Sequence, residues 1–498
     1  MGTTVDTSAT AVTRQALAAF QARDRDGAAA VIGHALKNKA DLGGTWGAIG
    51  RLAATLGEAN LAVEAAHRMV AASGHDLPSR LALSQTLAQF ARIADAKREA
   101  EALARQFPND GAAWHLLGTC QAQLGDKEAS LHSLRRALEL HTTGQAKAWT
   151  WQAIAEGKRF AHDDADLGDI THLLDAIPAT ADQAEARAIL LYALGKAWSD
   201  LGEHSRAFSA YEEGARLTQR LRPYNADSAD KFALSQIQNW TQKFHKTLPE
   251  GLASDRPIFV LGLPRSGTTL VEQILTTHEA VGDGGEINLF SAAAMPIRGL
   301  GHDAVEAFVA HRGTEGLQAV AGSYLHLLEQ WFGPVGRTVD KTLNHSRFLG
   351  LIATALPEAR FVWMQRDPRA VAWSCYRTRM ARGAEWSWSL QDIGRHFAME
   401  EKLCAHWTQI FGNRILHVSY ESLVQNPEKE IARLLGHLGL PDQQGLTDFH
   451  MSTRAVTTAS FDQVRRPIYT TANEAWRAQA DHLEPFVQTY RQFGGMSA

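Results

Sequence analysis

An anion-binding loop is the clearest chemical feature of this sequence. The stretch FVLGLPRSGTTLVEQIL, from Phe259 to Leu275, joins an apolar run to a helix-forming segment through Gly262 and Gly267. The apolar side chains after Gly267 recur at helical spacing, so the backbone N–H groups of residues 266–269 are expected at a helix N-terminus. Unpaired N–H groups and the helix dipole attract an anion there. The loop is therefore predicted to hold a phosphate group, and a serine/threonine helix cap without a ligand is the alternative.

The loop departs from an ATP-binding P-loop at one position. In that motif a lysine reaches the β- and γ-phosphates, and the serine or threonine after it holds Mg²⁺. Here Thr268 stands in the place of the lysine. Magnesium triphosphate is therefore a poor ligand. The guanidinium of Arg265, inside the loop, instead offers a fork for an anion of a nucleotide whose terminal group differs.

Separated motifs in a fixed order resemble one enzyme family. The motif PRSGTT follows a predicted strand, and RDPRAVAWS follows at residues 366–374. This order resembles the sulfotransferase family that uses 3′-phosphoadenosine 5′-phosphosulfate (PAPS), and within it the tyrosylprotein and the bacterial tetratricopeptide sulfotransferases. The resemblance covers roughly residues 255–470.

The resemblance implies a loop for the 5′-phosphosulfate of the donor. Its members are Arg265, Ser266, Gly267, Thr268 and Thr269. The expected position of these residues at a helix start agrees with that role, because backbone and hydroxyl donors gather there.

Further donor contacts are implied on later segments. Arg366 and Ser374 resemble the pair that binds the 3′-phosphate, since Arg366 ends a predicted strand and Ser374 lies about two turns into the next helix. An ion pair between Arg366 and Asp367 at the helix start is the alternative, and Arg369 is a further candidate. Two more residues complete the implied set, namely Tyr420 beside the adenine and Arg466 near the 3′-phosphate, where the tyrosylprotein enzymes have lysine and where Arg465 is adjacent.

Sulfuryl transfer to a hydroxyl needs a base and a cation at the leaving phosphate. The resemblance assigns Glu286 as general base, with a helix-capping role or a base at Asp283 as the alternatives. His278 and His345 are candidates because many cytosolic sulfotransferases use histidine, but His278 ends the helix after the loop and is expected to be structural. Lys341 resembles the lysine near the bridging oxygen, with a solvated strand-end lysine as the alternative. With Arg265 it forms the catalytic set beside Glu286, and this scheme requires no metal.

Residues 13–225 are predicted to form tetratricopeptide-like helical repeats. They are rich in alanine and leucine, with turns LGE, LGD and LGE at 56–58, 124–126 and 201–203. Trp46 and Trp114 lie 68 residues apart, which is two periods of 34. Small residues such as Gly118 and Gly195 fall where paired helices must approach closely. The alternative is a generic helical bundle, whereas a repeat array would offer a concave surface to a protein partner.

The pattern changes near residue 255. Short apolar runs alternate with helical segments, and four of them are predicted as buried strands, at 256–263, 337–340, 360–365 and 414–420. The predicted fold is an N-terminal all-α tetratricopeptide-type solenoid plus a C-terminal α/β P-loop-like sulfotransferase domain with a parallel sheet. The expected domain limits are 13–225 for the repeats, 226–254 for a helical linker and 255–498 for the sulfotransferase domain.

Composition restricts the class of partner and the compartment. The chain has 498 residues, 45% of them hydrophobic, with 50 basic against 54 acidic residues, which favours neither nucleic acid nor a membrane as a partner. The three cysteines are far apart in sequence, which argues against a disulfide framework. Neither a signal peptide nor an apolar run of about 18 residues is present. A soluble, cytoplasmic protein is expected.

The leading hypothesis is a PAPS-dependent sulfotransferase that acts by in-line transfer with Glu286 as general base. The acceptor is a hydroxyl compound, which leaves a peptide tyrosine, a saccharide and a small phenol open. Residues 377–396 either line an acceptor cleft or pack on the surface. The alternatives are a nucleotide kinase or ATPase with a degenerate P-loop, and a non-catalytic tetratricopeptide scaffold. A scaffold has no use for Arg265, Glu286 and Lys341 in concert.

Overall fold

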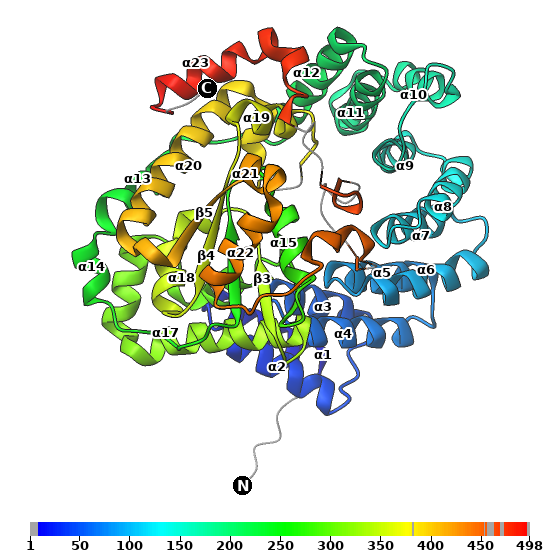
Figure 1. Cartoon of the computed structure of the whole chain (residues 1–498). Coiled ribbons are helices and arrows are strands. Elements are labelled where there is room, and N and C mark those ends of the chain that lie inside the picture. Colours follow the sequence, from blue (N-terminus) through cyan, green and yellow to red (C-terminus); the bar gives the residue numbers. More distant parts are fainter. Residues whose placement is uncertain (1–7, 381–382, 453, 456–462, 469–472, 496–498) are drawn as a thin grey trace.

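The computed structural model of the chain describes residues 8–380, 383–452, 454–455, 463–468 and 473–495. Its first part is an arc of helices in which each packs on the next, from blue through cyan to green in Figure 1. The arc confirms the predicted helical architecture of this region. Its helices are α1 (Ala9–Gln21), α2 (Arg25–Lys37), α3 (Trp46–Thr55), α4 (Ala59–Ala72), α5 (Leu77–Gln89), α6 (Ile93–Gln106), α7 (Gly111–Gln123), α8 (Lys127–Leu140), α9 (Gly144–Gly157), α10 (Ala165–Ala176), α11 (Ala184–Asp200) and α12 (His204–Leu221).

Glycine makes the turns and the close contacts of the arc. The turns after α3, α7 and α11 place Gly57, Gly125 and Gly202 at φ 80°, 88° and 77°, a region that favours glycine. Within the pairs, a Cβ atom on Gly118 would lie 2.7 Å from Leu134, and one on Gly195 would lie 2.6 Å from the ring of Tyr211. The expected close approach of paired helices at small residues is confirmed.

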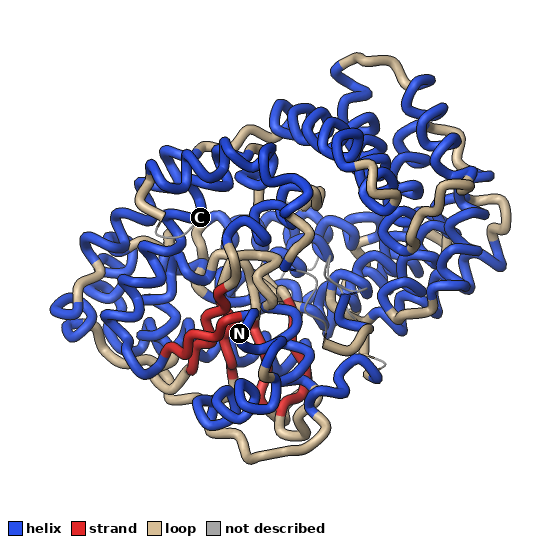
Figure 2. The backbone as a smooth tube through the Cα atoms, turned by 45° about the horizontal axis from the view of Figure 1, so that its top comes forward, coloured by secondary structure: helices blue, strands red, loops and turns tan. Residues whose placement is uncertain are grey.

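The second part is built on a five-stranded parallel sheet, red in Figure 2, with strand order β2-β3-β1-β4-β5. Four strands fall where the sequence predicts them, whereas β2 was not predicted. The strands are β1 (Pro257–Leu261), β2 (Val281–Gly285), β3 (Arg337–Asp340), β4 (Arg360–Gln365) and β5 (Ile415–Ser419). The helices of this part are α15 (Thr268–Thr276), α16 (Leu289–Ala293), α17 (His302–Phe332, broken at Gly313), α18 (Leu349–Ala355), α19 (Pro368–Tyr376), α20 (Leu390–Phe411), α21 (Tyr420–Gln425), α22 (Pro427–Leu438) and α23 (Glu484–Gln492).

Helices cover both faces of the sheet, because alternate side chains of each strand point to opposite sides. Phe259 and Leu261 of β1 join a core with α17, α18 and α20, and Ile258 and Val260 join a second core with α15 and α22. The sheet is therefore buried between two hydrophobic cores, and the carboxyl ends of its parallel strands lie together at one edge.

Two helices occupy the segment predicted as a helical linker, α13 (Ala226–Asn239) and α14 (Gln242–Thr247). Trp240, between them, is fully buried and packs edge-on against Trp407 of α20, with ring centroids 6.0 Å apart. The segment therefore contributes to the core of the sheet domain.

The arc contacts the sheet domain near both of its ends. On α17, Trp331 donates its indole N–H to the carbonyl of Gly57 at 3.3 Å. Near the other end, Phe208 of α12 stacks on Trp373 of α19 and on His482, with centroid distances of 6.3 Å and 4.0 Å. The middle of the arc faces the carboxyl edge of the sheet.

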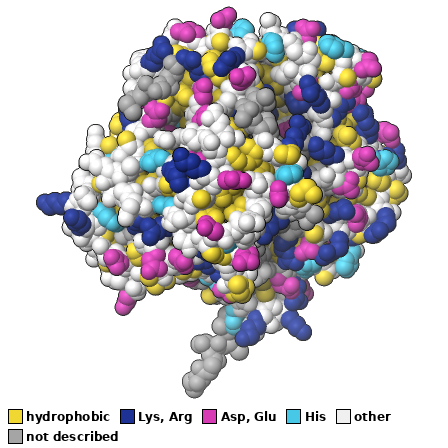
Figure 3. Space-filling model, viewed as in Figure 1, with side chains coloured by type: hydrophobic (Ala, Val, Ile, Leu, Met, Phe, Trp, Pro, Cys, Tyr) yellow, Lys and Arg dark blue, Asp and Glu magenta, His cyan; other side chains and the backbone are white. Residues whose placement is uncertain are grey.

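The outer surface shows no segregation of charge on the face drawn in Figure 3, where acidic and basic side chains are interspersed. This agrees with the near balance of the two kinds in the sequence. Within the described part of the chain, none of the helices combines the length and the apolar character needed to cross a membrane.

Candidate functional site

The glycine-bracketed loop lies between β1 and α15, as predicted. Gly262 has a φ of 132°, and Gly267, the N-cap of α15, has a φ of 106°. The hydroxyl of Ser266 donates to the carbonyl of Leu263 at 2.6 Å and closes the loop from within. The first turn of α15 carries Thr268 and Thr269, both buried. First-turn N–H groups of a helix lack intrahelical partners, so the loop has the geometry of an anion site.

Arg265, Ser374 and Arg366 lie together beside this loop. The Nε of Arg265 donates to the hydroxyl of Ser374 on α19 at 2.9 Å. Arg366, at the end of β4, donates from Nη1 to the backbone carbonyl of Arg265 at 3.0 Å. Asp367 caps α19 by accepting from the N–H groups of Arg369 and Ala370, which leaves the guanidinium of Arg366 to the loop. The structure thus brings the residues predicted for the two ends of the donor to one place.

An aromatic wall borders the loop. The guanidinium of Arg366 lies 4.2 Å from the centre of the Tyr420 ring, a cation–π contact, and its Nε donates to Asn473 at 2.7 Å. A Cβ atom on Gly267 would lie 2.6 Å from Cδ2 of Tyr420, so only glycine allows the helix start to approach this ring. Arg466 lies across the same pocket.

Two connected hollows meet at the loop. The smaller, called the nucleotide pocket after the ligand predicted from the sequence, has about 60 Å³ of open space and is lined by Arg265, Thr268, Arg366, Tyr420, Arg466 and neighbouring apolar side chains. The larger, the interdomain cavity, has about 560 Å³ and lies between the arc and the sheet domain. Arg265 and Arg466 line both, so the two spaces are continuous at these arginines.

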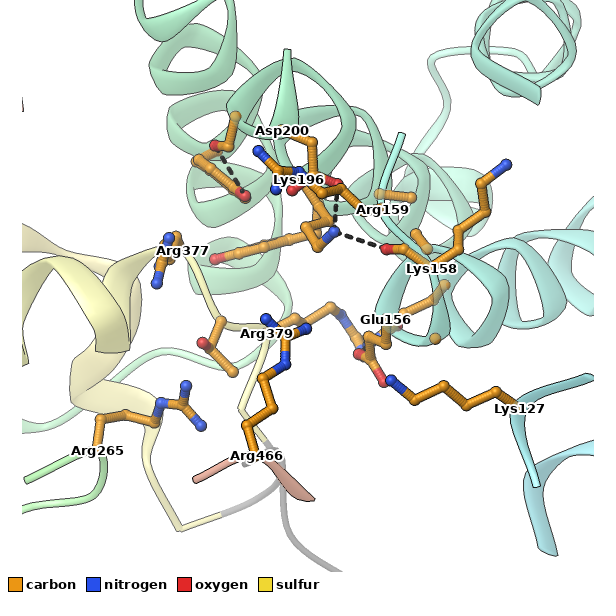
Figure 4. Close-up of a pocket in the computed structure, with 18 residues that line it drawn as sticks. Lys127, Glu156, Lys158, Arg159, Lys196, Asp200, Arg265, Arg377, Arg379 and Arg466 are labelled. Carbon is orange, nitrogen blue, oxygen red and sulfur yellow. Dashed lines mark hydrogen bonds and ion pairs between the residues drawn. The ribbon is translucent and has the colours of Figure 1, made fainter. Parts of the chain in front are cut away.

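The interdomain cavity is rich in cations from both parts of the chain. Figure 4 shows Arg265, Arg377 and Arg466 entering from the sheet domain, and Lys127 and Lys196 from the arc. Its cationic lining residues are Lys127, Lys158, Arg159, Lys196, Arg265, Arg377, Arg379 and Arg466, against the carboxylates of Glu156 and Asp200. Such a space attracts polyanions.

Glu156, which the sequence analysis did not single out, lies on the cavity wall formed by α9. Its side chain is exposed to the cavity and accepts a hydrogen bond from Gln152 at 2.8 Å, but protein atoms surround it on most sides. This desolvation raises the pKa of Glu156, against the opposing charges of Arg379 and Arg265.

Lys341 and Glu286 form an ion pair behind the loop. Lys341 follows β3, and its buried Nζ donates to Oε1 of Glu286 at 2.8 Å. The side chain of Glu286 is 42% exposed, so its carboxylate is open to an incoming molecule. Glu286 does not cap the next helix, since Asn288 is the N-cap residue of α16. Neither residue lines the interdomain cavity.

A second carboxylate near Lys341 was not predicted. Oε2 of Glu272, on α15, lies 3.5 Å from Nζ of Lys341 and is buried. Burial by itself lowers the pKa of Lys341, but the two carboxylates outweigh it and the pKa is raised, so the amine is charged. Glu272 lies one helical turn after Thr268, outside the apolar stripe of α15, so the sequence pattern gave no signal for this contact.

The alternative bases have other contacts. Burial raises the pKa of Asp283, on β2, which accepts from the N–H of Gly284 at 2.8 Å. His278 is buried, with Nε2 2.9 Å from the carbonyl of Pro441 and Nδ1 accepting from Ala280, in agreement with a structural role. His345 is fully buried, and burial lowers its pKa. Within the described residues, no cluster of three or more metal-ligating side chains of His, Cys, Asp or Glu occurs.

The described residues of the segment 377–396 have two kinds of surroundings, and whether the segment lines an acceptor cleft stays a prediction. Arg377 and Arg379 line the interdomain cavity. Trp386 and Trp388 are buried, and Trp386 stacks on His396 with ring centroids 4.2 Å apart. The cations of this segment thus face the cavity while its aromatic side chains pack.

Sequence comparisons find a matching family model for a segment in each part of the chain. Residues 257–444 match the model of the sulfotransferase family, and residues 111–141 match a tetratricopeptide repeat model. An uncharacterized protein of Aquifex aeolicus is 28% identical over 392 residues, which are 74% of this chain and 51% of that protein. A protein-tyrosine sulfotransferase of Drosophila melanogaster is 26% identical over 235 residues, 45% of this chain and 47% of the fly protein. The chain spans about half the length of these two curated relatives.

Among solved structures, the sulfotransferase domain of the Synechococcus PCC 7002 olefin synthase is 21% identical, with a TM-score of 0.35, over 49% of this chain and 95% of that one. The family-model match coincides with the parallel sheet, the glycine-bracketed loop and the Lys341–Glu286 pair described above. Residues 257–444 of this chain are thus similar to the sulfotransferase family, and a match to a tetratricopeptide repeat precedes them.

Proposed function

We propose that the chain transfers a sulfuryl group from PAPS to a hydroxyl acceptor. The observation that carries this proposal is the nucleotide pocket, in which the first turn of α15, Arg265, Arg366, Tyr420 and Arg466 converge. Three guanidinium groups and a helix start suit a nucleotide with phosphate at both its 3′ and 5′ positions. The position of lysine in an ATP-binding loop is taken by Thr268, which disfavours a magnesium triphosphate.

The pocket residues fit this donor by their chemistry. The loop from Arg265 to Thr269 would hold the 5′-phosphosulfate, and Arg366 with Ser374 and Arg466 would hold the 3′-phosphate. Tyr420 offers a ring face to the adenine. When bound, the donor supplies an activated sulfuryl group whose leaving group is a phosphate.

The remaining groups of the site would then act on the acceptor and on the leaving phosphate. Glu286 accepts the proton of the acceptor hydroxyl as the hydroxyl oxygen bonds to sulfur. Lys341 and Arg265 stabilise the negative charge that the phosphate oxygen gains as its bond to sulfur breaks. The 2.8 Å hydrogen bond from Lys341 fixes the orientation of the Glu286 carboxylate. This scheme requires no metal.

A protein or peptide tyrosine is the acceptor that we favour. The similarity to a protein-tyrosine sulfotransferase supports this choice. The repeat arc would bind a protein, since paired-helix arrays offer concave surfaces for partners.

The test is isothermal titration of the full chain with adenosine 3′,5′-bisphosphate in the absence of magnesium, beside ATP with magnesium. We expect the bisphosphate to bind and the variant carrying Arg366→Ala and Ser374→Ala to lose that binding. Preference for ATP with magnesium, or no binding of the bisphosphate by the wild type, would reject the proposal in favour of another nucleotide enzyme or a scaffold.

A further inference from the structure

Consecutive arginines near the C-terminus have different partners. Arg466 lines the nucleotide pocket and the interdomain cavity. Arg465 turns the other way, toward the repeat arc, and its Nη2 donates to the backbone carbonyl of Gln123 at 3.1 Å. That carbonyl is at the last residue of α7, where the negative end of a helix dipole favours a cation.

The same guanidinium also donates hydrogen bonds to two backbone carbonyls within the sheet domain. Nη1 donates to the carbonyl of Ser452 at 3.1 Å, and Nη2 to the carbonyl of Arg454 at 2.9 Å. Arg465 therefore joins the end of α7, Ser452, Arg454 and its own segment by three hydrogen bonds to backbone carbonyls.

The segment that carries Arg465 forms part of the nucleotide pocket. Val464, Arg466, Pro467 and Ile468 all line it, together with Tyr420 and residues of α15. The pocket has only about 60 Å³ of open space, against about 300–1,000 Å³ for small-molecule sites in general, so a small displacement of this wall changes its shape appreciably.

We propose that the repeat arc completes the nucleotide site by holding Arg465 on the turn after α7, which fixes residues 464–468 as a wall of the pocket. Arg465 is then a positioning residue, and the arc is a structural part of donor binding as well as a surface for partners. This inference rests on the proposed function, because it concerns the same nucleotide. Its physical basis is preorganisation, since a wall that is already in place need not be ordered when the nucleotide binds.

The turn itself provides a test from the repeat side. Gly125 lies directly under the guanidinium, and a Cβ atom there would be 2.8 Å from Cζ and 2.9 Å from Nε of Arg465. Gly125→Ala should therefore displace Arg465 without altering any residue of the sheet domain.

The chain offers a matched control. Gly202 occupies the equivalent position of the LGE turn after α11, with a φ of 77° against 88° at Gly125. In both turns the glycine N–H bonds to the carbonyl three residues earlier, and its own carbonyl accepts from the N–H two residues later. A Cβ atom on Gly202 meets nothing within 4 Å. Gly202→Ala thus carries the same backbone strain without a contact to the nucleotide site.

The experiment compares the affinity of the full chain and its variants for adenosine 3′,5′-bisphosphate. We expect Gly125→Ala and Arg465→Ala each to weaken binding about tenfold, because hydrogen bonds from a charged group are lost. Gly202→Ala should bind within about twofold of wild type, and Arg465→Lys, which can still donate to a carbonyl, should bind more tightly than Arg465→Ala. The double variant Gly125→Ala with Arg465→Ala should be no weaker than the single variants, since both break the same contact.

Equal or tighter binding by Arg465→Ala or by a folded Gly125→Ala would overturn the inference, and so would equal weakening by Gly202→Ala. Thermal unfolding of each variant identifies a loss that comes from unfolding, and Arg465→Ala keeps the test decisive where the alanine at position 125 prevents folding. Failure of the wild type to bind the bisphosphate would instead reject the proposed function. The two failures are therefore distinguishable.

Discussion

Replacement of Lys341 by methionine tests most directly the electrostatics of the ion pairs that Lys341 forms with Glu286 and Glu272. The side chain of Lys341 is fully buried between Glu286 and Glu272. Methionine keeps much of the volume and removes the charge. Glu272 is then left as a buried carboxylate without its cation, and we expect the folded state to be destabilised.

The magnitude follows from the two distances. For Lys341 and Glu272 at 3.5 Å, Coulomb's law with an effective dielectric constant of about 20 gives about 5 kcal/mol. The removal of one partner from a buried ion pair costs about 3–5 kcal/mol, which agrees. The contact with Glu286 at 2.8 Å is shorter, but that carboxylate is 42% exposed and screened by solvent, so it adds about 1 kcal/mol or less. The loss of stability is therefore expected to come mainly from Glu272.

The dependence on pH identifies the group responsible. Burial raises the pKa of Glu272 above its ordinary value of 4.5 even in the presence of Lys341, whose charge opposes the shift. Loss of that charge raises the pKa further. A group with a raised folded pKa contributes stability below its unfolded pKa and loses it as the pH rises through the folded pKa. The deficit of Lys341→Met relative to wild type should therefore be smaller at about pH 5 than at about pH 8.

Unfolding of the full chain in urea, followed at both pH values, measures this deficit. The double variant Lys341→Met with Glu272→Gln is the control, because it lacks the buried Glu272 carboxylate that the single variant leaves without a cation. It should be more stable than Lys341→Met alone at the higher pH. Equal stability of these two variants, or a deficit that does not change with pH, would refute the electrostatic reasoning and leave a packing defect as the cause.

The other predictions concern activity and nucleotide affinity. Glu286→Gln should lower kcat for transfer of radiolabelled sulfur from PAPS to a tyrosine peptide by about 100-fold or more, with bisphosphate affinity unchanged. Asp283→Asn should keep kcat within a few-fold. An equal loss of kcat in both variants would reject Glu286 as the base. Gly267→Ala should weaken bisphosphate binding by more than about tenfold, because its Cβ atom would meet Tyr420 at 2.6 Å and the φ of 106° disfavours alanine; binding like wild type in a titration would contradict the pocket geometry. Bisphosphate affinity should also fall with added salt. The fall should be shallower in the double variant Arg159→Ala with Arg377→Ala, because both cations line the interdomain cavity. An identical dependence of affinity on salt in the wild type and the double variant would exclude a contribution from that cavity.

Sequence patterns predicted the fold class because the signals are local. The strand β1 and the helix α15 follow from an apolar run and a helical stripe on either side of a glycine loop. The repeat turns follow from the LGE and LGD triplets. In contrast, β2 has the sequence VGDGG, and glycine and aspartate are depleted in strands. It is a strand because it pairs with β3 at the edge of the sheet, a tertiary effect that its own residues do not reveal.

The candidate site was predictable in part for the same reason. The motif spacing brought out Arg265, Arg366 and Tyr420, and the structure gathers them around one pocket. Glu272 lies outside the apolar stripe of α15 in the sequence pattern, and its contact with Lys341 depends on how α15 lies on β3. Glu156 comes from the repeat arc, and no local pattern links α9 to a loop more than a hundred residues later.

The adjacent arginines show how the two halves of the chain are connected. The resemblance implied a place near the 3′-phosphate for Arg466 and gave Arg465 only as its neighbour in the sequence. In the structure, Arg466 faces the nucleotide pocket and Arg465 bonds to the end of α7. A rigid arc that is packed on the sheet domain near both ends can hold such a bond in place, whereas a flexibly tethered repeat domain could not. The packing of the arc therefore provides a physical reason for the repeats and the sulfotransferase domain to occur in one chain, and the Gly125→Ala and Gly202→Ala pair tests that reason from the repeat side alone.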